Sequence, residues 1–200
     1  MRTMNKQKVI YTIIGLIFSI LVIIILSQNV YNTNTSSYRA LTRPLAKEPL
    51  LISSAGQNTD IYIVKDIINK LMIDNYFIPM ATTENLDDIH SAIMVVGYSE
   101  VGNRLKDKTY LEEKQRVEQF VKAIEEKDVF LITIYLRGGK MLSEETKTLL
   151  NLSAKSSDYV IIVNPENEVD TFKEMVSSTT PITFVDELSE VTEPIVSAFR

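Results

Sequence analysis

The stretch PLLISSAGQNTDIYIVKDIINKL, residues 49–71, decides the fold that we predict for this 200-residue chain. It opens with an apolar run over residues 50–52 and continues into a small, polar turn over residues 53–59. After the turn, apolar side chains recur at helical spacing and predict an amphipathic helix. These side chains are Ile61, Val64, Ile68 and Leu71. A strand that leads through a short turn into a helix is the first half of a βαβ unit.

The rest of the chain repeats this alternation of apolar runs and helix-period segments. The runs predict five further strands, at residues 76–78, 92–96, 129–135, 159–163 and 182–185. The helical periodicity predicts helices at 85–89, 111–127, after 143, around 172–176 and at the C-terminus. Continuous apolar runs are typical of strands that are buried on both faces of a parallel sheet. We therefore expect a three-layer α/β domain with a Rossmann-like or flavodoxin-like parallel sheet.

Pro79 indicates where the second strand lies in this sheet. Because proline has no N–H to donate to a neighbouring strand, a strand that runs into it is expected at an edge. The flavodoxin-like order 2-1-3-4-5 places the second strand there. We expect the sixth strand to lie beyond the fifth.

An uncharged apolar segment, VIYTIIGLIFSILVIIIL, occupies residues 9–26. As a helix it would span close to the ~30 Å hydrocarbon layer of a bilayer. The basic tail at residues 1–8 precedes it, and no charge follows before Arg39, which predicts a cytoplasmic N-terminus. We therefore predict a transmembrane signal-anchor, a flexible linker at residues 27–48 and an extracytoplasmic domain at 49–200, in a single-pass protein of the cell membrane. The alternative is a cleaved signal peptide, but the apolar run is longer than the usual core of about 7–15 residues and no A-x-A site follows.

The charge of the predicted domain argues against nucleic-acid binding. Six of the 21 basic residues but only one of the 26 acidic residues lie before Pro49, so the remaining chain carries 15 basic and 25 acidic side chains. A domain this acidic repels phosphate backbones, because binding to them depends on lysine and arginine displacing counterions.

The chain also lacks the residues on which several kinds of catalytic and metal site depend. It has no cysteine and one histidine, His90. Thiolate nucleophiles, cysteine-ligated zinc and Ser–His or Cys–His systems are therefore not expected. We assign no catalytic residue, no metal ligand and no cofactor.

A binding site in an open α/β sheet is expected beyond the carboxyl ends of the strands, where the strand order reverses. The candidate residues follow the first, third and fourth predicted strands, and are Ser53, Ser54, Gly56, Gln57, Asn58, Gly97, Tyr98, Ser99, Arg137, Gly138 and Lys140. The turn after the first strand leads into a helix N-terminus and could receive an anion or a carbonyl oxygen. Alternatively, its glycine permits a tight turn and its serines satisfy backbone groups. The two cations near the fourth strand could hold an anionic ligand or could be solvated in a flexible turn.

These features support several functions. We favour a non-catalytic module for ligand binding, sensing or interaction, which binds a small polar or anionic ligand or a protein partner in the envelope. The alternative is a hydrolase or transferase in which Lys140 activates Ser53 or Ser54. A third possibility is a scaffold that contacts a membrane or wall complex.

The segment PLLISSAGQN, residues 49–58, resembles the start of the domain in an uncharacterised bacterial family of exported or membrane-anchored proteins. The VVG sequence at 95–97 and the glycine pair at 138–139 are similar to later motifs of that family. The resemblance covers the chain from Pro49 to the C-terminus. It implies a Rossmann-like or flavodoxin-like exported domain and no known activity. Residues 102–110 depart from the family, because this loop is more charged here than the glycine-rich version in the family.

Overall fold

The computed structural model describes residues 41–137, 142–165 and 168–200. The predicted basic tail, transmembrane segment and most of the predicted linker lie outside these residues. Within the described ranges, no helix is both long and apolar enough to cross a membrane.

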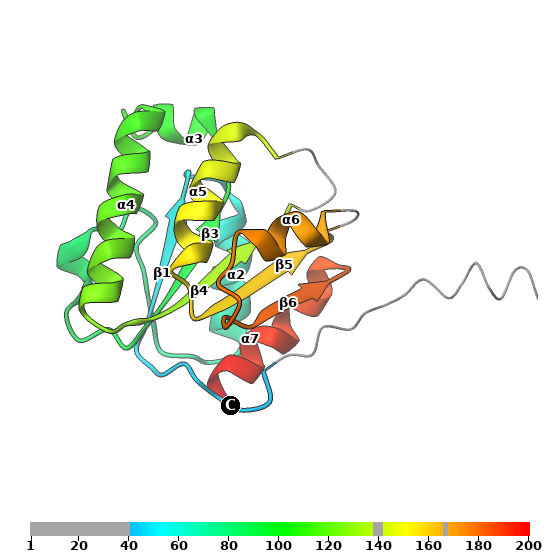
Figure 1. Ribbon diagram of the computed structural model, residues 1–200. Coiled ribbons are helices and arrows are strands. Elements are labelled where there is room, and N and C mark those ends of the chain that lie inside the picture. Colours follow the sequence, from blue (N-terminus) through cyan, green and yellow to red (C-terminus); the bar gives the residue numbers. More distant parts are fainter. Residues whose placement is uncertain (1–40, 138–141, 166–167) are drawn as a thin grey trace, which may run out of the picture. The chain divides into compact units, whose positions relative to one another are not determined.

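Six parallel strands form one sheet with the order β2-β1-β3-β4-β5-β6 (Figure 1). The strands are β1 (Leu50–Ala55), β2 (Asn75–Phe77), β3 (Ser91–Val96), β4 (Phe130–Tyr135), β5 (Tyr159–Val163) and β6 (Ile182–Val185). The predicted order is confirmed, including the sixth strand beyond the fifth. The edge position predicted for β2 from Pro79 is confirmed as well.

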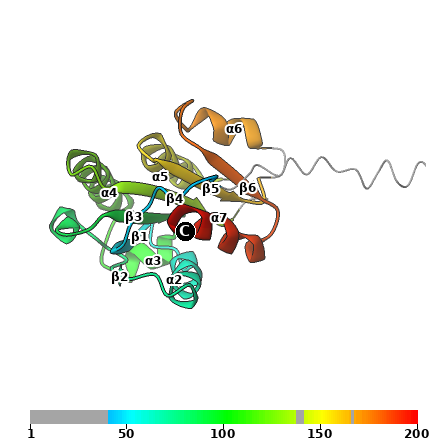
Figure 2. The same cartoon turned by 90° about the horizontal axis from the view of Figure 1, so that it is seen from below.

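Helices cover both faces of this sheet (Figure 2). The α-helices are α2 (Asp60–Lys70), α3 (Glu100–Arg104), α4 (Tyr110–Glu126), α5 (Glu144–Lys155), α6 (Val169–Glu174) and α7 (Thr192–Phe199), and the 3₁₀ helices are η1 (Thr83–Leu86) and η2 (Leu188–Val191). One apolar core joins the sheet to α4, α5 and α6, and a second joins its other face to α2 and α7. The expected three layers are therefore present.

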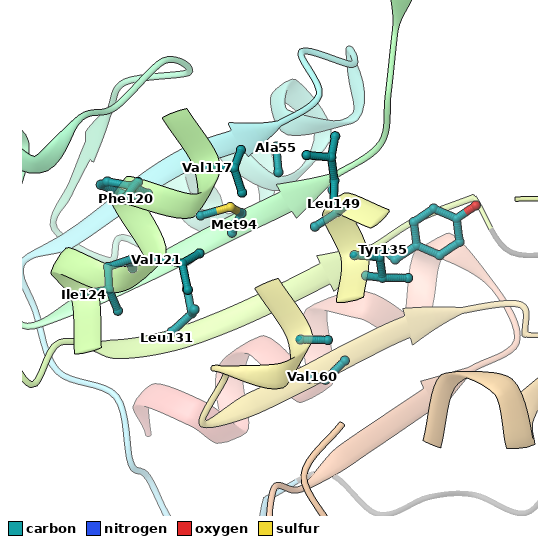
Figure 3. Packing of buried hydrophobic residues seen from close by; sticks show 14 of the residues in the cluster. Ala55, Met94, Val117, Phe120, Val121, Ile124, Leu131, Tyr135, Leu149 and Val160 are labelled. Atoms are coloured by element: carbon teal, nitrogen blue, oxygen red, sulfur yellow. The ribbon is translucent and has the colours of Figure 1, made fainter. Parts of the chain in front are cut away.

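The core between the sheet and α4 is built from side chains at helical spacing on α4. Val117, Phe120 and Ile124 are almost fully buried against Met94 of β3 and Leu131 of β4 (Figure 3).

Ser143 caps α5 as expected, because its hydroxyl accepts a hydrogen bond from the N–H of Thr146 at 3.2 Å.

Two local expectations were wrong, and one helix was missed. Ser53 and Ser54, which we placed in the turn, belong to β1 because they pair with Met94 and Val95 of β3. The helix expected at 85–89 is the 3₁₀ helix η1, which starts and ends earlier. The helix α3 was not predicted, because it is only five residues long and carries a glycine.

The segment at 41–48, which is the end of the predicted linker, contacts the domain at the amino edge of the sheet. The N–H groups of Leu45 and Ala46 both donate to the carbonyl oxygen of Ala198 in α7, at 2.9 and 2.8 Å. The N–H of Lys47 donates to the hydroxyl of Ser91, the first residue of β3, at 2.8 Å. The chain therefore enters the domain at the edge opposite the carboxyl ends of the strands.

Replacing Phe120 with alanine tests the packing of α4 on the sheet. The side chain is 1% exposed, so Phe120→Ala should lower the free energy of unfolding by about 3–5 kcal/mol. Leu111→Ala on the same helix is the control, because Leu111 is 60% exposed and its loss should change stability by less than about 0.5 kcal/mol. Urea unfolding of the two variants measures both values, and equal losses would contradict the packing described here.

Candidate functional site

The turns after β1 and β3 meet at the carboxyl edge of the sheet, as the predicted switch point requires. The N–H of Gly97 donates to the carbonyl oxygen of Ala55 at 2.9 Å, and the N–H of Ser99 donates to that of Gly56 at 2.7 Å. Gln57 and Tyr98 form an isolated antiparallel bridge. The predicted residues from these two turns are therefore brought together.

Gly56 is required at this crossing for two reasons. Its φ is +101°, a conformation that side chains with a Cβ rarely adopt. A Cβ at this position would also lie 2.5 Å from the carbonyl oxygen of Gly97. The close contact between the two turns therefore depends on the absence of a side chain at Gly56.

A buried carboxylate from α4 occupies the turn after β1. Glu113 is fully buried, and its Oε1 accepts hydrogen bonds from the N–H of Gly56 at 2.8 Å and from Nε2 of Gln57 at 3.1 Å. Arg116 donates to the same carboxylate through Nε and Nη2, both at 2.8 Å. The donors that could have received an external anion therefore bind an anion of the chain itself.

These contacts control the pKa of Glu113. Burial alone would raise it, but the hydrogen bonds and charge of Arg116, together with the hydrogen bonds from Gly56 and Gln57, outweigh burial and lower the pKa below its ordinary value of 4.5. Glu113 is therefore ionised in the folded domain at neutral pH.

Arg116 extends this network to two further segments. Its Nη1 donates to the carbonyl oxygen of Ala81 at 2.7 Å, and its Nη2 donates to that of Ser54. One guanidinium therefore joins α4, the end of β1 and the segment after β2. We call Glu113, Arg116, Gly56 and Gln57 the turn network.

The two serines of β1 are fully buried and satisfy backbone groups. The Ser53 hydroxyl donates to the carbonyl oxygen of Pro79 and accepts from the N–H of Ala81, both at 3.3 Å. The Ser54 hydroxyl accepts from the N–H of Gln57 at 3.1 Å. Neither side chain is exposed to solvent. Both serines therefore satisfy backbone groups, as the alternative interpretation of the turn expected. A role of Ser53 and Ser54 in ligand binding stays a prediction.

A second buried carboxylate, Asp60, binds the cation predicted after β4. Arg137 donates to Asp60 through Nε at 2.6 Å and through Nη2 at 2.9 Å, a bidentate pair. Asn58 orients Asp60, because its Nδ2 donates both to Oδ2 of Asp60 and to the carbonyl oxygen of Val96, each at 3.2 Å. The hydrogen bond to Asp60 raises the pKa of Arg137, so this side chain stays charged. The predicted residues Gly138 and Lys140 lie outside the described residues.

The turn after β3 is held by its neighbours as well. The N–H of Tyr98 donates to the hydroxyl of Thr146 at 3.1 Å, and its ring packs edge-to-face on Tyr110 with centroids 5.4 Å apart. Burial, followed by the nearby charges of Glu100 and Glu145, raises the pKa of Tyr98. Tyr98 is therefore a neutral phenol at physiological pH.

Sequence reasoning missed the residues that organise this edge, namely Glu113, Arg116, Asp60 and Asn103. One signal could have revealed Glu113: it stands four residues before Val117, on the apolar stripe of the predicted helix, where a solvated charge does not belong. Asn103 had no comparable signal. Among the described residues, no group of acidic or histidine side chains could hold a metal ion.

Residues 47–199 match the family described as Domain of unknown function (DUF6305), and the chain belongs to this family. The resemblance to a family without known activity is confirmed to that extent. No curated protein matches the sequence. Among solved structures, the chain is similar to a GDSL-like lipase from Bacteroides thetaiotaomicron VPI-5482, with a TM-score of 0.33 and 8% identity over 68% of this chain. The match covers 66% of the lipase chain, just under two thirds of its length, and at these values it carries no argument about activity.

Replacing Glu113 with glutamine tests the turn network. The change leaves the guanidinium of Arg116 without its carboxylate, so Glu113→Gln should lower the free energy of unfolding at pH 7 by about 3 kcal/mol. Because the folded-state pKa of Glu113 is lowered, its charge stabilises the fold fully above about pH 4.5 and loses this effect as the pH falls through the folded-state value. The difference between wild type and variant should therefore be constant from pH 7 to 5 and shrink below pH 4.5.

Urea unfolding between pH 7 and 3.5 measures this difference. Glu118→Gln is the control, because Glu118 is an exposed residue of the same helix, paired with Lys114 at 3.5 Å, and should contribute less than about 1 kcal/mol. A Glu113→Gln difference that is unchanged at pH 3.5 would show that the charge of the carboxylate is not what stabilises the turn.

Proposed function

We propose that this domain is a non-catalytic interaction module, which a transmembrane anchor at residues 9–26 holds outside the cytoplasm and which recognises a protein partner in the cell envelope. The observation that carries this proposal is that carboxylates of the chain occupy the switch-point turn. Glu113 takes the donors of Gly56 and Gln57, and Asp60 binds Arg137. An external anion would have to displace one of these carboxylates from a buried position, which costs several kcal/mol for each separated ion.

The burial of both serines argues against the hydrolase or transferase alternative. A nucleophile must reach the reacting atom of its substrate, and Ser53 and Ser54 are not exposed to solvent. Their hydroxyls also hold the backbone of the segment after β2 and of the turn itself. Activation by Lys140 would therefore require β1 to open at its carboxyl end, where it pairs with β3.

The anchor and its orientation are supported by the sequence of the N-terminal segment. Residues 9–26 carry no charge, and the basic residues cluster before them. The net charge of the remaining chain is negative, with 25 acidic against 15 basic side chains. A negative surface does not favour adsorption to anionic lipids, which fits a domain that works on proteins beside the membrane.

A thermal-shift screen distinguishes a protein-binding module from one that binds small ligands. We expect no member of a panel of small carboxylic acids, phosphates and sugars to raise the melting temperature of the wild-type protein, because the polar groups of the turn are already paired. Arg137→Gln is compared with Lys122→Gln, a change of an exposed lysine on α4. A ligand that stabilises wild type and Lys122→Gln but not Arg137→Gln would contradict the proposal and support a small anionic ligand.

Cysteine labelling tests the proposed topology, because the natural chain contains no cysteine. In intact cells a membrane-impermeant maleimide should label Lys122→Cys in the domain and should spare Lys8→Cys in the basic tail. Permeabilised cells provide the control, in which both positions should react. Labelling of position 8 alone in intact cells would reverse the orientation, and labelling of neither position before permeabilisation would place the domain inside the cell.

A further inference from the structure

The donors of the turn network are held in place by contacts that do not involve Glu113. The carbonyl oxygen of Gly56 accepts hydrogen bonds from the N–H of Ser99 at 2.7 Å and from Nδ2 of Asn103 at 3.1 Å. These contacts fix the residue whose N–H donates to Glu113. The N–H of Gly56 would therefore keep its position if the carboxylate were removed.

The other two donor residues have independent contacts as well. The N–H of Gln57 donates to the hydroxyl of Ser54 at 3.1 Å, and its Nε2 donates to the carbonyl oxygen of Pro79 at 3.4 Å. Arg116 donates to the carbonyl oxygens of Ala81 and Ser54. Removal of the carboxylate would thus leave a set of donors that is already ordered, and such a set loses little free energy when it binds an anion.

The arrangement of these donors fits a planar carboxylate. Nε of Arg116 donates to Oε2 of Glu113, and Nη2 donates to Oε1, both at 2.8 Å. Two parallel N–H groups of a guanidinium match the two oxygens of a carboxylate. Oε1 also accepts from the N–H of Gly56 and from the side-chain amide of Gln57. The position therefore provides both the geometry and the number of hydrogen bonds that a desolvated carboxylate needs.

Arg116 supplies the positive charge at this position. Its side chain is 11% exposed, and within the described residues it forms an ion pair with Glu113 alone. A Glu113→Ala variant would leave this cation mostly buried and unpaired, which is unfavourable. A free anion that restores the ion pair would relieve this state and would be bound for that reason.

We propose that the turn after β1 is a carboxylate-binding site that Glu113 occupies as a ligand supplied by the chain itself, and that a free carboxylate of the size of acetate binds there once this side chain is removed. Truncation at Cβ removes a methylene group and the carboxylate, which correspond to the heavy atoms of acetate. An engineered cavity in a protein interior can take up a small molecule. In the wild-type chain the tethered carboxylate is present at a high effective concentration, so a free acid does not displace it. The site is independent of the proposed interaction module, because it uses the polar groups of the turn and not a surface that a partner would contact.

Calorimetric melting of the full chain in detergent micelles at neutral pH tests this site. Acetate at about 100 mM, compared with chloride at the same concentration, should raise the melting temperature of Glu113→Ala by about 3–6 °C, the shift expected for a dissociation constant on the order of 10 mM. The wild-type chain should show no such difference between acetate and chloride, because Glu113 already occupies the site.

Matched variants assign the effect to the site. Glu118→Ala removes the same atoms from an exposed position of α4, and Phe120→Ala opens an apolar cavity on the same helix, so neither should respond to acetate. Glu113→Gln fills the position with an amide of similar shape and should not respond either. Glu113→Ala combined with Arg116→Gln lacks the charge of the site, and its response should fall to the wild-type level.

The length of the acid provides a second measurement. Glu113→Gly removes one carbon more than Glu113→Ala, so propionate should stabilise Glu113→Gly more than acetate does. Acetate should be the better ligand of Glu113→Ala. If either variant does not fold in chloride, trimethylamine N-oxide is added to favour the compact state, and folding in each acid is followed by circular dichroism.

The remaining outcomes would overturn the site or its assigned residues. An effect of acetate that is equal in Glu113→Ala, Glu118→Ala and Phe120→Ala, including no effect at all, would overturn the site and leave the interaction module in place. A shift of wild type as large as that of Glu113→Ala would show that Glu113 is not the occupant. A response that persists without the guanidinium of Arg116 would overturn the donors assigned here.

Discussion

The burial of Glu113 is the constraint on which the carboxyl edge of this domain depends. Moving a carboxylate out of water costs several kcal/mol, and a buried charge is stable only when it is paired and fully hydrogen-bonded. Glu113 meets this requirement with four donors, of which two belong to Arg116 and two to the turn after β1. The carboxylate therefore stabilises the conformation of the turn in which the N–H of Gly56 and the side-chain amide of Gln57 donate to it.

The attraction of unpaired N–H groups to anions explains why an anion-binding site is expected at this turn. It also explains why carboxylates of the chain itself bind there. Unpaired N–H groups at a strand-to-helix turn attract anions, and in many α/β proteins the anion belongs to a ligand. In this domain the N–H of Gly56 binds Glu113, and the cation after β4 binds Asp60. At this edge the polar groups of the turn and of Arg137 therefore pair with carboxylates of the chain itself. A function that depends on exposed side chains at the rim leaves the contacts of Glu113 and Asp60 intact. A ligand that binds the polar groups of the turn itself has to displace these carboxylates.

The sequence was sufficient for the arrangement of the strands and insufficient for the chemistry at their ends. Continuous apolar runs and Pro79 predicted the parallel sheet and its order, because burial on both faces and the missing N–H of proline act on each strand independently of distant residues. Neither Glu113 nor Arg116 was named from the sequence, because charged residues are rarely buried unless paired. Their partners lie 57 and 62 residues away along the chain, and no local pattern encodes such a pairing. The serines of β1 were assigned to a turn because they are polar and follow a short apolar run. The strand continues through them because they pair with β3, which is distant in the sequence.

The turn network also links the stability of the domain to the surface at its rim. Asn103 holds α3 on the carbonyl oxygen of Gly56, while Glu113 holds the N–H of that same residue. The two peptide groups that flank Gly56 therefore connect α4 to α3. Because both contacts act on a glycine whose φ of +101° side chains rarely adopt, the position of α3 follows from the same backbone conformation that the buried carboxylate selects. The hydrogen bonds of Asn103 to Gly56 and Ser99 therefore fix the position of a helix that is only five residues long.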